Sequence, residues 1–438
     1  MSGQQKLLVA ASLFSCLSKA ALAVLSQLVV SSTAVDSEVV HQILEAHAVP
    51  MLINMLARHS RTAAGLLCIM AKEQQCKEAF LEQSALKVLV DCLSGQAAVA
   101  KEAAGVLWRV ATDCDKAKLE VAKAGAVGPA VALLQASDRN AASIASATEA
   151  AYLLAEMAEH PCTHQLIIQH GSLAAILRIM HATSHTEAAY SSSGRQADLS
   201  SGQQGCSGQS TNSTDCMDSA DSTGLLRNRL LVAANAALVS LTGNPDTHFR
   251  LVNEGAAPAL VATLQYGTVN AQALACNSTH AIAASDQRHV AVFARAGAIP
   301  WLVGLLHQWP CHPCGRNAAL TLKEVLQNPD YQSEACACGT IPALVAMLKG
   351  SDVDCQAAAA SLLHTLAAAT HISRKKAISR GGGIPALLAV LAGESAEGSM
   401  HAAQSLLHMA KLPDLKVQIV HAGQVWMGHD IPIALMLM

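Results

Sequence analysis

The chain has 438 residues, of which 52% are hydrophobic, 14% charged and only 3% aromatic, with a formal net charge of −3. This near balance of charge, without a basic stripe, argues against nucleic-acid binding driven by counterion release. No run of 18 or more uncharged apolar residues is present, so the sequence predicts no transmembrane segment. The 14 cysteines follow no disulfide-framework spacing, which is typical of a reducing compartment and favours a cytoplasmic or nuclear location.

The N-terminal segment admits two interpretations. Residues 7–30 fit the second and third helices of a helical repeat. The apolar run over residues 7–17, preceded by Lys6 and followed by the small-residue segment 18–20, also resembles a secretory signal peptide. Serines interrupt that run, and residues 21–29 match the repeat pattern described below, which favours the helices.

From residue 47 onward a short cassette returns about every 40 residues: a small residue or glycine, an aliphatic residue, often proline, then an apolar helix. Its copies begin at His47, Ser84, Gly125, Gly171, Gly255, Gly297, Gly339, Gly382 and Gly423. The four copies from Gly255 to Gly382 carry proline at the fourth position and lie 42, 42 and 43 residues apart. A fixed period of this length predicts a helical solenoid, in which each unit buries its apolar face only by stacking on the next.

A second pattern supports the first. Each unit also contains an alanine-rich helix, as at residues 63–71 and 103–111, and these helices recur with the same period. Alanine and leucine are strong helix formers, and no sustained alternation of apolar and polar residues predicts a strand. Both patterns share one step of 84 residues, about two periods.

Residues 183–224 account for the double step. This segment is rich in Ser, Gly, Gln, Thr and Asp, and has too little apolar surface to offset the entropy of ordering the chain. It follows an apolar helix ending near Met180 and precedes one starting near Leu225. We therefore expect a disordered insertion between the second and third helices of one repeat, separating a repeat block over 1–182 from another over 225–438.

The cassettes at Gly297, Gly339 and Gly382, each followed by an alanine-rich helix on this period, resemble the armadillo repeat. The resemblance implies an all-α, right-handed α-solenoid of about nine repeats with three helices each, the first partial and the last truncated. In that family, glycine breaks the end of the previous unit's helix and proline starts the next helix. The third helices line a concave groove that binds other proteins, often as extended peptides. The resemblance thus implies a non-catalytic scaffold or adaptor without a cofactor.

The subfamily is less defined. Nuclear import adaptors of this family carry ladders of Asn and Trp on their third helices, and neither ladder is present. The positions of the Asn ladder hold Gln27, Ile69, Arg109, Glu156, Ser240, Ala281, Glu324, Thr365 and His408. The general pattern is closer to the vacuolar armadillo scaffold and to the armadillo regions of plant-type ubiquitin ligases. The start Met1-Ser2-Gly3 lacks the glycine directly after methionine that N-myristoylation requires, and no U-box-like segment precedes the repeats. A substrate-recognition adaptor of a ubiquitin ligase stays an alternative, as does a nuclear transport adaptor.

The larger side chains on the third helices are the candidate partner contacts, because Trp, Tyr and Arg are enriched at binding hot spots. The predicted groove residues are Trp108, Arg109, Tyr152, Glu156, Asn277, Lys323 and Glu324. The alternative is that Trp108 and Tyr152 only pack between repeats and that the charges form a solvated face.

Other motifs give no support to catalysis or metal binding. Residues 311–314 form a C-x2-C pair and Cys336 and Cys338 a second pair, but a third helix of roughly 20 Å would separate them, which is too far for one zinc ion. His364 and His408 occupy near-equivalent repeat positions, which indicates common repeat ancestry. No nucleophile elbow, phosphate-binding loop, dinucleotide fingerprint or zinc-protease motif is present. We therefore predict no enzyme activity, no cofactor and no metal.

Overall fold

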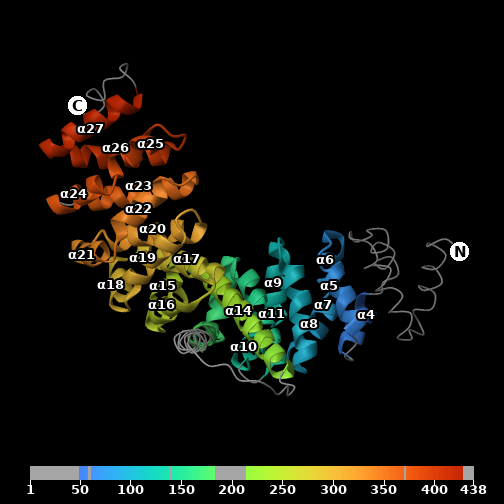
Figure 1. Cartoon of the computed structure of the whole chain (residues 1–438). Helices are drawn as coiled ribbons and strands as arrows, with labels where there is room; N and C mark the ends of the chain where they lie inside the picture. Colours follow the sequence, from blue (N-terminus) through green and yellow to red (C-terminus); the bar gives the residue numbers. More distant parts are fainter. Residues whose placement is uncertain (1–48, 58–60, 138–139, 183–213, 369–370, 428–438) are drawn as a thin grey trace, which may run out of the picture. The chain divides into compact units, whose positions relative to one another are not determined.

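The computed structural model describes residues 49–57, 61–137, 140–182, 214–368 and 371–427 (Figure 1). All regular secondary structure within these ranges is helical. The described chain divides into two compact units, unit 1 ending at Asn244 and unit 2 beginning at Pro245. Both are built from helices in a repeating order of first, second and third, so the chain is an all-α solenoid of armadillo-like repeats, as the period predicts.

Unit 1 contains two complete three-helix repeats, preceded by the helices of a partial repeat and followed by a repeat interrupted at residues 183–213. The helices are α4 (Val49–Ala57), α5 (Arg61–Met70), α6 (Gln74–Phe80), α7 (Gln83–Leu93), α8 (Ala97–Ala111), α9 (Asp115–Lys123), α10 (Val127–Gln135), α11 (Ala141–Ala158), α12 (Pro161–Gln169), the helix Ser172–Ala182, and α14 (Thr214–Thr242). The third helices α5, α8, α11 and α14 pack successively side by side.

Unit 2 contains four complete repeats and one further helix. The helices are α15 (Pro245–Asn253), α16 (Ala256–Tyr266), α17 (Val269–Ser285), α18 (Gln287–Arg295), α19 (Ala298–Gln308), α20 (Pro313–Val325), α21 (Pro329–Ala337), α22 (Thr340–Leu348), α23 (Val353–Ala368), α24 (Ile372–Arg380), α25 (Gly383–Leu391), α26 (Ala396–Ala410) and α27 (Pro413–Met427). Here α17, α20, α23 and α26 form the row of third helices.

Small residues allow the third helices to approach closely. On α8, Ala103, Ala104 and Gly105 are all buried, and Leu107 beside them is fully buried. On α11, Ala147 and Ala151 are also fully buried. Because adjacent repeats bury these faces only against each other, the core runs continuously through each unit.

The glycine of the cassette adopts a left-handed conformation, as its place before a new helix requires. Six glycines have φ between 74° and 90°: Gly125, Gly171, Gly255, Gly297, Gly339 and Gly382. They lie between the first and second helices of the same repeat, and not at the end of the previous unit, which corrects that part of the expectation. Pro300 is the third residue of α19. Its missing N–H is therefore one of the four that have no partner within a helix.

Two expected boundaries differ from the structure. The helix α14 begins at Thr214, so residues 214–224, expected in the insertion, are helical; residues 183–213 lie outside the described residues. Extending a packed helix adds one hydrogen bond per residue, which favours this extension. The ninth cassette predicts a break at Gly423, but α27 continues through it. The fourth position of this cassette is Trp426 and not proline, and a glycine inside a helix costs only about 1 kcal/mol. The helices expected over 7–30 also lie outside the described residues.

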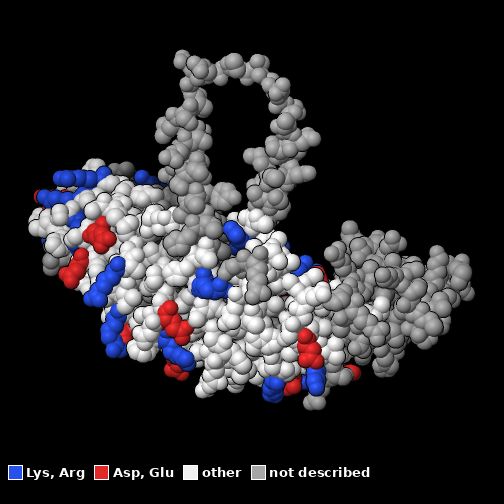
Figure 2. Space-filling view, turned by 90° about the horizontal axis from the view of Figure 1, so that it is seen from below, with Lys and Arg blue, Asp and Glu red and all other residues white. Residues whose placement is uncertain are grey.

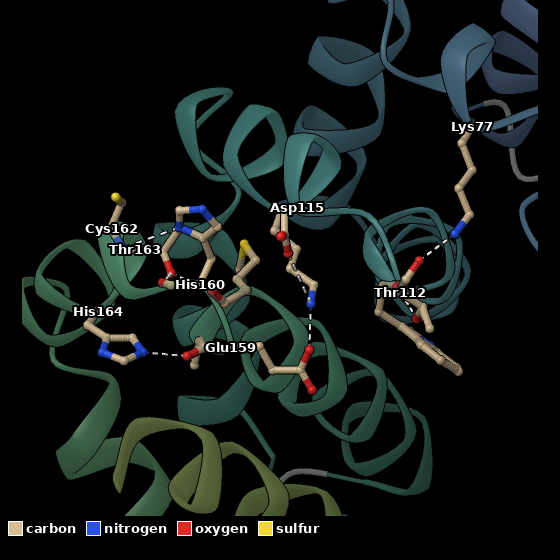
Figure 3. A network of polar contacts seen from close by, with 12 residues as sticks. Lys77, Thr112, Asp115, Glu159, His160, Cys162, Thr163 and His164 are labelled. Atoms are coloured by element: carbon tan, nitrogen blue, oxygen red, sulfur yellow. Dashed lines mark hydrogen bonds and ion pairs between the residues drawn. The ribbon is translucent and has the colours of Figure 1, made fainter. Parts of the chain in front are cut away.

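A buried polar side chain occupies the fourth position of several first helices and contacts the end of a third helix (Figure 3). In α6, Lys77 donates to the carbonyl oxygen of Thr112. In α9, Lys118 Nζ lies 2.5 Å from Glu159 Oε2. In α12, a ring nitrogen of His164 contacts the carbonyl oxygen of Ala158. The contacts of Lys77 and His164 provide partners for carbonyl oxygens at the ends of third helices, where the last carbonyls have no partner within the helix.

Candidate partner-binding face

An aromatic cluster lies on the third helices of unit 1. The rings of Trp108 on α8 and Tyr152 on α11 have centroids 5.8 Å apart, and both side chains are half-buried. Trp108 Nε1 donates to Glu149 Oε2 at 2.6 Å, and Arg109 Cζ lies 4.4 Å from the Trp108 ring centroid. We call Trp108, Arg109, Glu149 and Tyr152 the Trp108 cluster. It combines an apolar surface with a cation held over an aromatic face and a hydrogen-bonded carboxylate.

The groups around the cluster hold its side chains in place. Arg109 donates to the carbonyl oxygen of Gly105 at 2.5 Å, one turn earlier on α8. Burial raises the pKa of Tyr152, with the charge of Arg229 on α14 opposing this effect. Burial also raises the pKa of the neighbouring Cys68 thiol to about 11, although Arg109 lowers it. This thiol is therefore protonated near neutral pH, which makes it a poor nucleophile.

Glu156 extends the same face. It lies four residues after Tyr152 on α11, and residues at this spacing share one side of a helix. The Glu156 side chain is half-buried, and burial raises its pKa, supported by the charge of Glu159 and opposed by that of Lys118. The structure thus brings four of the predicted residues, Trp108, Arg109, Tyr152 and Glu156, onto adjacent third helices.

The three predicted residues of unit 2 lie on the neighbouring helices α17 and α20. Asn277 is exposed, while Lys323 and Glu324 are partly exposed. Glu324 Oε2 accepts a hydrogen bond from Gln327 Nε2 at 2.7 Å. Burial lowers the pKa of His280 on α17, with Glu324 raising it and Lys323 lowering it. Lys323 and Glu324 on α20 therefore lie near His280 on the adjacent third helix α17.

Several side chains on these faces were not among the predicted contacts. Glu149 lies three residues before Tyr152, so helical spacing from a candidate aromatic residue is a signal that could find it. The imidazoles of His364 on α23 and His408 on α26 have centroids 5.2 Å apart. Repeat equivalence placed these two histidines in neighbouring units, but their ring contact depends on side-chain conformation.

Within the described ranges, no group of three or more His, Cys, Asp or Glu side chains could hold a metal ion. Cys314 lies near the start of α20, and Cys336 and Cys338 lie at the end of α21. The second pair therefore lies at the end of the first helix of the next repeat, and not at the far end of the third helix α20 as the sequence predicts.

Charged groups are distributed without a dominant sign. On the face in Figure 2, lysine and arginine side chains alternate with aspartate and glutamate, singly or in small groups, across uncharged surface. Among the described residues, no single helix is long and apolar enough to span a membrane. The helices α18 and α19 are long and apolar enough only when taken together, and they are bent by 84° relative to each other.

Comparison with solved structures gives one superposition that supports the fold. An engineered protein solved by a structural genomics consortium superposes with a TM-score of 0.71 at 22% identity, covering 96% of this chain and 92% of that one. A computationally designed armadillo repeat protein for modular peptide recognition matches with a TM-score of 0.48 at 17% identity, over 64% of this chain and 99% of that one. A designed armadillo repeat protein in complex with the peptide (KR)4 matches with a TM-score of 0.47 at 16% identity, over 65% and 99%.

No protein-family model matches the chain, and no curated protein matches it. The similarity to the engineered protein, at 22% identity, shows the fold alone. The chain is an armadillo-like α-solenoid. This class is defined by the three-helix repeats, the left-handed glycines and the rows of third helices.

Proposed function

We propose that this chain is a non-catalytic scaffold or adaptor that binds segments of partner proteins on the third-helix faces of its repeats. The observation that carries the proposal is the Trp108 cluster. It places a Trp, a Tyr and an Arg, the residue types enriched at binding hot spots, together on two adjacent helices and leaves them partly exposed.

The geometry favours recognition by a pre-organised surface. Trp108 is held by Glu149 and Arg109, so its side chain loses less conformational freedom when a partner binds. The helices that carry the cluster have alanine-rich buried faces, which limit their movement relative to each other. A partner segment lying across α8 and α11 would meet the aromatic pair first and Glu156 one turn later.

Affinity capture from cell extract tests this proposal. The bait proteins are the wild-type chain, a face variant Arg109→Glu with Glu156→Arg, and a matched control Glu120→Lys with Lys123→Glu. The control reverses an exposed ion pair on the first helix α9, whose Lys123 Nζ and Glu120 Oε1 lie 2.9 Å apart. Circular dichroism and thermal melting establish that all three proteins are folded.

We expect partners captured by the wild type and the control to be lost in the face variant. Identical partners for all three baits would contradict the proposal. The identity of the partners also defines the kind of adaptor: co-capture of ubiquitin-ligase subunits would assign substrate recognition, and transport receptors would assign nuclear transport. Partners from the cytoplasm would support the proposed cytoplasmic location.

A further inference from the structure

Three imidazoles gather on the third helices at the C-terminal end of unit 2. His364 on α23 stacks on His401 of α26 with ring centroids 6.1 Å apart, and its ring is 5.2 Å from that of His408 on the same helix. All three side chains are partly exposed. Nδ1 of His364 is buried and has no hydrogen-bond partner within the described residues.

Lysines on α20 and α24 and at the end of α26 lie near these rings. The charge of Lys323 on α20 lowers the pKa of His364, and the charge of Lys375 on α24 lowers the pKa of His408. Lys411, just after α26, places its Nζ 3.3 Å from Nδ1 of His408. Lys375 is itself buried, and burial and the charge of Lys411 lower its pKa.

Negative charge is scarce at this place. Glu397 Oε1 lies 3.9 Å from His401 Nε2, and its side chain is 72% exposed. Among the described residues, none of Lys323, Lys375 and Lys411 has a carboxylate oxygen within ion-pair distance. The positive charges at this place therefore favour the binding of an anion, because a carboxylate reduces the repulsion between like charges held close together.

We propose that His364, His401, His408, Lys323 and Lys411, which we call the imidazole–lysine patch, bind the carboxylates of an acidic partner segment, more tightly as the pH falls from neutral towards about 5.5. Charge complementarity selects the acidic segment as the occupant. The inference rests on the proposed binding function and names the partner chemistry and the regulation for unit 2.

The direction of the pH dependence follows from the surroundings of the rings. Burial, then His408, His401 and Lys323, lower the pKa of His364. Burial, then Lys411 and Lys375, lower the pKa of His408. Both rings are therefore largely neutral near pH 7. A bound carboxylate favours the protonated rings, so the complex holds more protons than the free protein, and affinity rises as the pH falls.

Fluorescence anisotropy of a labelled octa-aspartate peptide tests the inference at about pH 7.5 and about pH 5.5 and at one low ionic strength. Aspartate, with a pKa of about 3.9, stays ionised at both values. The proteins are the full-length wild type, the double variant His364→Gln with His408→Gln, and the control His371→Gln. His371 is exposed before α24 and its side chain makes no capping hydrogen bond.

We expect the wild type and the control to bind the peptide at least about fivefold more tightly at the lower pH, since protonation of two rings adds two charges. The double variant loses this gain. Lys323→Ala weakens binding at both pH values, because it removes one lysine from the patch. Absence of binding at the lower pH, or an undiminished gain in the double variant, would overturn the inference.

This result is separable from the test of the proposed function, since the capture variants alter only unit 1. If the peptide does not bind but the Arg109→Glu and Glu156→Arg variant loses partners, only the inference about unit 2 fails. If the peptide binds as expected but capture is unchanged in that variant, the unit 1 face fails and the patch stands.

Discussion

Lys118 shows how a single residue in this chain reconciles charge with burial. Its side chain is 6% exposed, and its Nζ contacts Glu159, whose side chain is 55% exposed (Figure 3). The same Nζ lies 3.9 Å from Asp115 Oδ1. Burial lowers the pKa of Lys118, but the hydrogen bond and charge of Glu159 outweigh this effect, so the pKa is raised. The lysine stem therefore packs in the interior while its charged end reaches a carboxylate close to water.

Replacing Lys118 with methionine should destabilise the protein by about 1–2 kcal/mol, because Met keeps the buried stem but removes the charge-assisted hydrogen bond. Glu159 can then be hydrated, so the larger cost of a stranded buried charge does not apply. Urea unfolding measures the change. The matched control is Lys123→Met, which breaks an exposed pair and should change stability by less than about 0.5 kcal/mol. Equal effects of both substitutions would contradict this account of Lys118.

At this scale the sequence predicts which residue types could bind, but not which side chains meet. Trp108 and Tyr152 could be singled out by type and helical position, and the structure places them in contact. Helical spacing from Tyr152 makes Glu149 a candidate, but its hydrogen bond to Trp108 joins two helices and depends on side-chain conformation, which the sequence does not predict. The burial of Lys118 could not be predicted from the sequence either, since it depends on packing between repeats.

At the scale of one helix, the cassette glycine sets the entry into the second helix. Gly297 has φ of 80° before α19, and a Cβ added there would meet no atom within 4 Å. The requirement for glycine is therefore one of backbone conformation, and not of space. Gly304, inside the same helix, is exposed and also has open space around its Cα.

These two glycines give opposite predictions for the same substitution. Gly297→Ala should destabilise the protein by roughly 1–2 kcal/mol, the cost of a left-handed conformation for a residue with a Cβ. Gly304→Ala should stabilise it by about 0.5–1 kcal/mol, because alanine loses less backbone entropy in a helix interior. Thermal unfolding of both variants beside the wild type measures the effects. A neutral or stabilising Gly297→Ala would show that the entry turn tolerates another conformation.

The start of α18 gives a prediction that depends on pH. Asp286 Oδ1 accepts from the backbone N–H of Arg288 at 2.8 Å, and Oδ2 accepts from its guanidinium at 2.9 and 2.7 Å. The side-chain hydrogen bonds of Arg288, followed by the backbone one, lower the pKa of Asp286 from 3.8 to about 2. Because the folded pKa is below the unfolded one, the carboxylate's contribution to stability is complete above pH 3.8 and is lost as the pH falls through about 2.

The comparison is with Asp286→Asn, which can still cap the helix but does not titrate. The stability difference between the two proteins should be constant from neutral pH to about pH 5 and should shrink as the pH approaches about 2. Urea unfolding at a series of pH values measures this difference. If it stays constant over the whole range, the carboxylate of Asp286 does not have the lowered pKa that its contacts indicate.

The repeat elements were predictable because glycine, proline and alanine act locally. Left-handed Gly255, Gly339 and Gly382 stand where the cassette places them. Boundaries were harder to predict where tertiary packing competes with propensity. The polar start of α14 is helical in spite of its composition, and Gly423 lies inside α27, so neither composition nor a single glycine was decisive.

Across the whole chain, we propose that the rows of third helices are the surfaces that meet other proteins. The period predicts a solenoid, and stacking of repeats explains why each row is continuous within its unit. The third helices carry both the Trp108 cluster and the imidazole–lysine patch. The identity of the partners lies outside what a repeat period can encode, since it depends on a few side chains placed on a common scaffold.

Site-specific photo-crosslinking in cells tests this claim most directly. A photoreactive amino acid is placed at Glu156 on the third helix α11 in one protein and at Lys123 on the first helix α9 in another, both within unit 1. We expect crosslinked partner proteins from position 156 and few or none from position 123. Crosslinks predominantly from position 123 would contradict the account and place partner binding on the first helices.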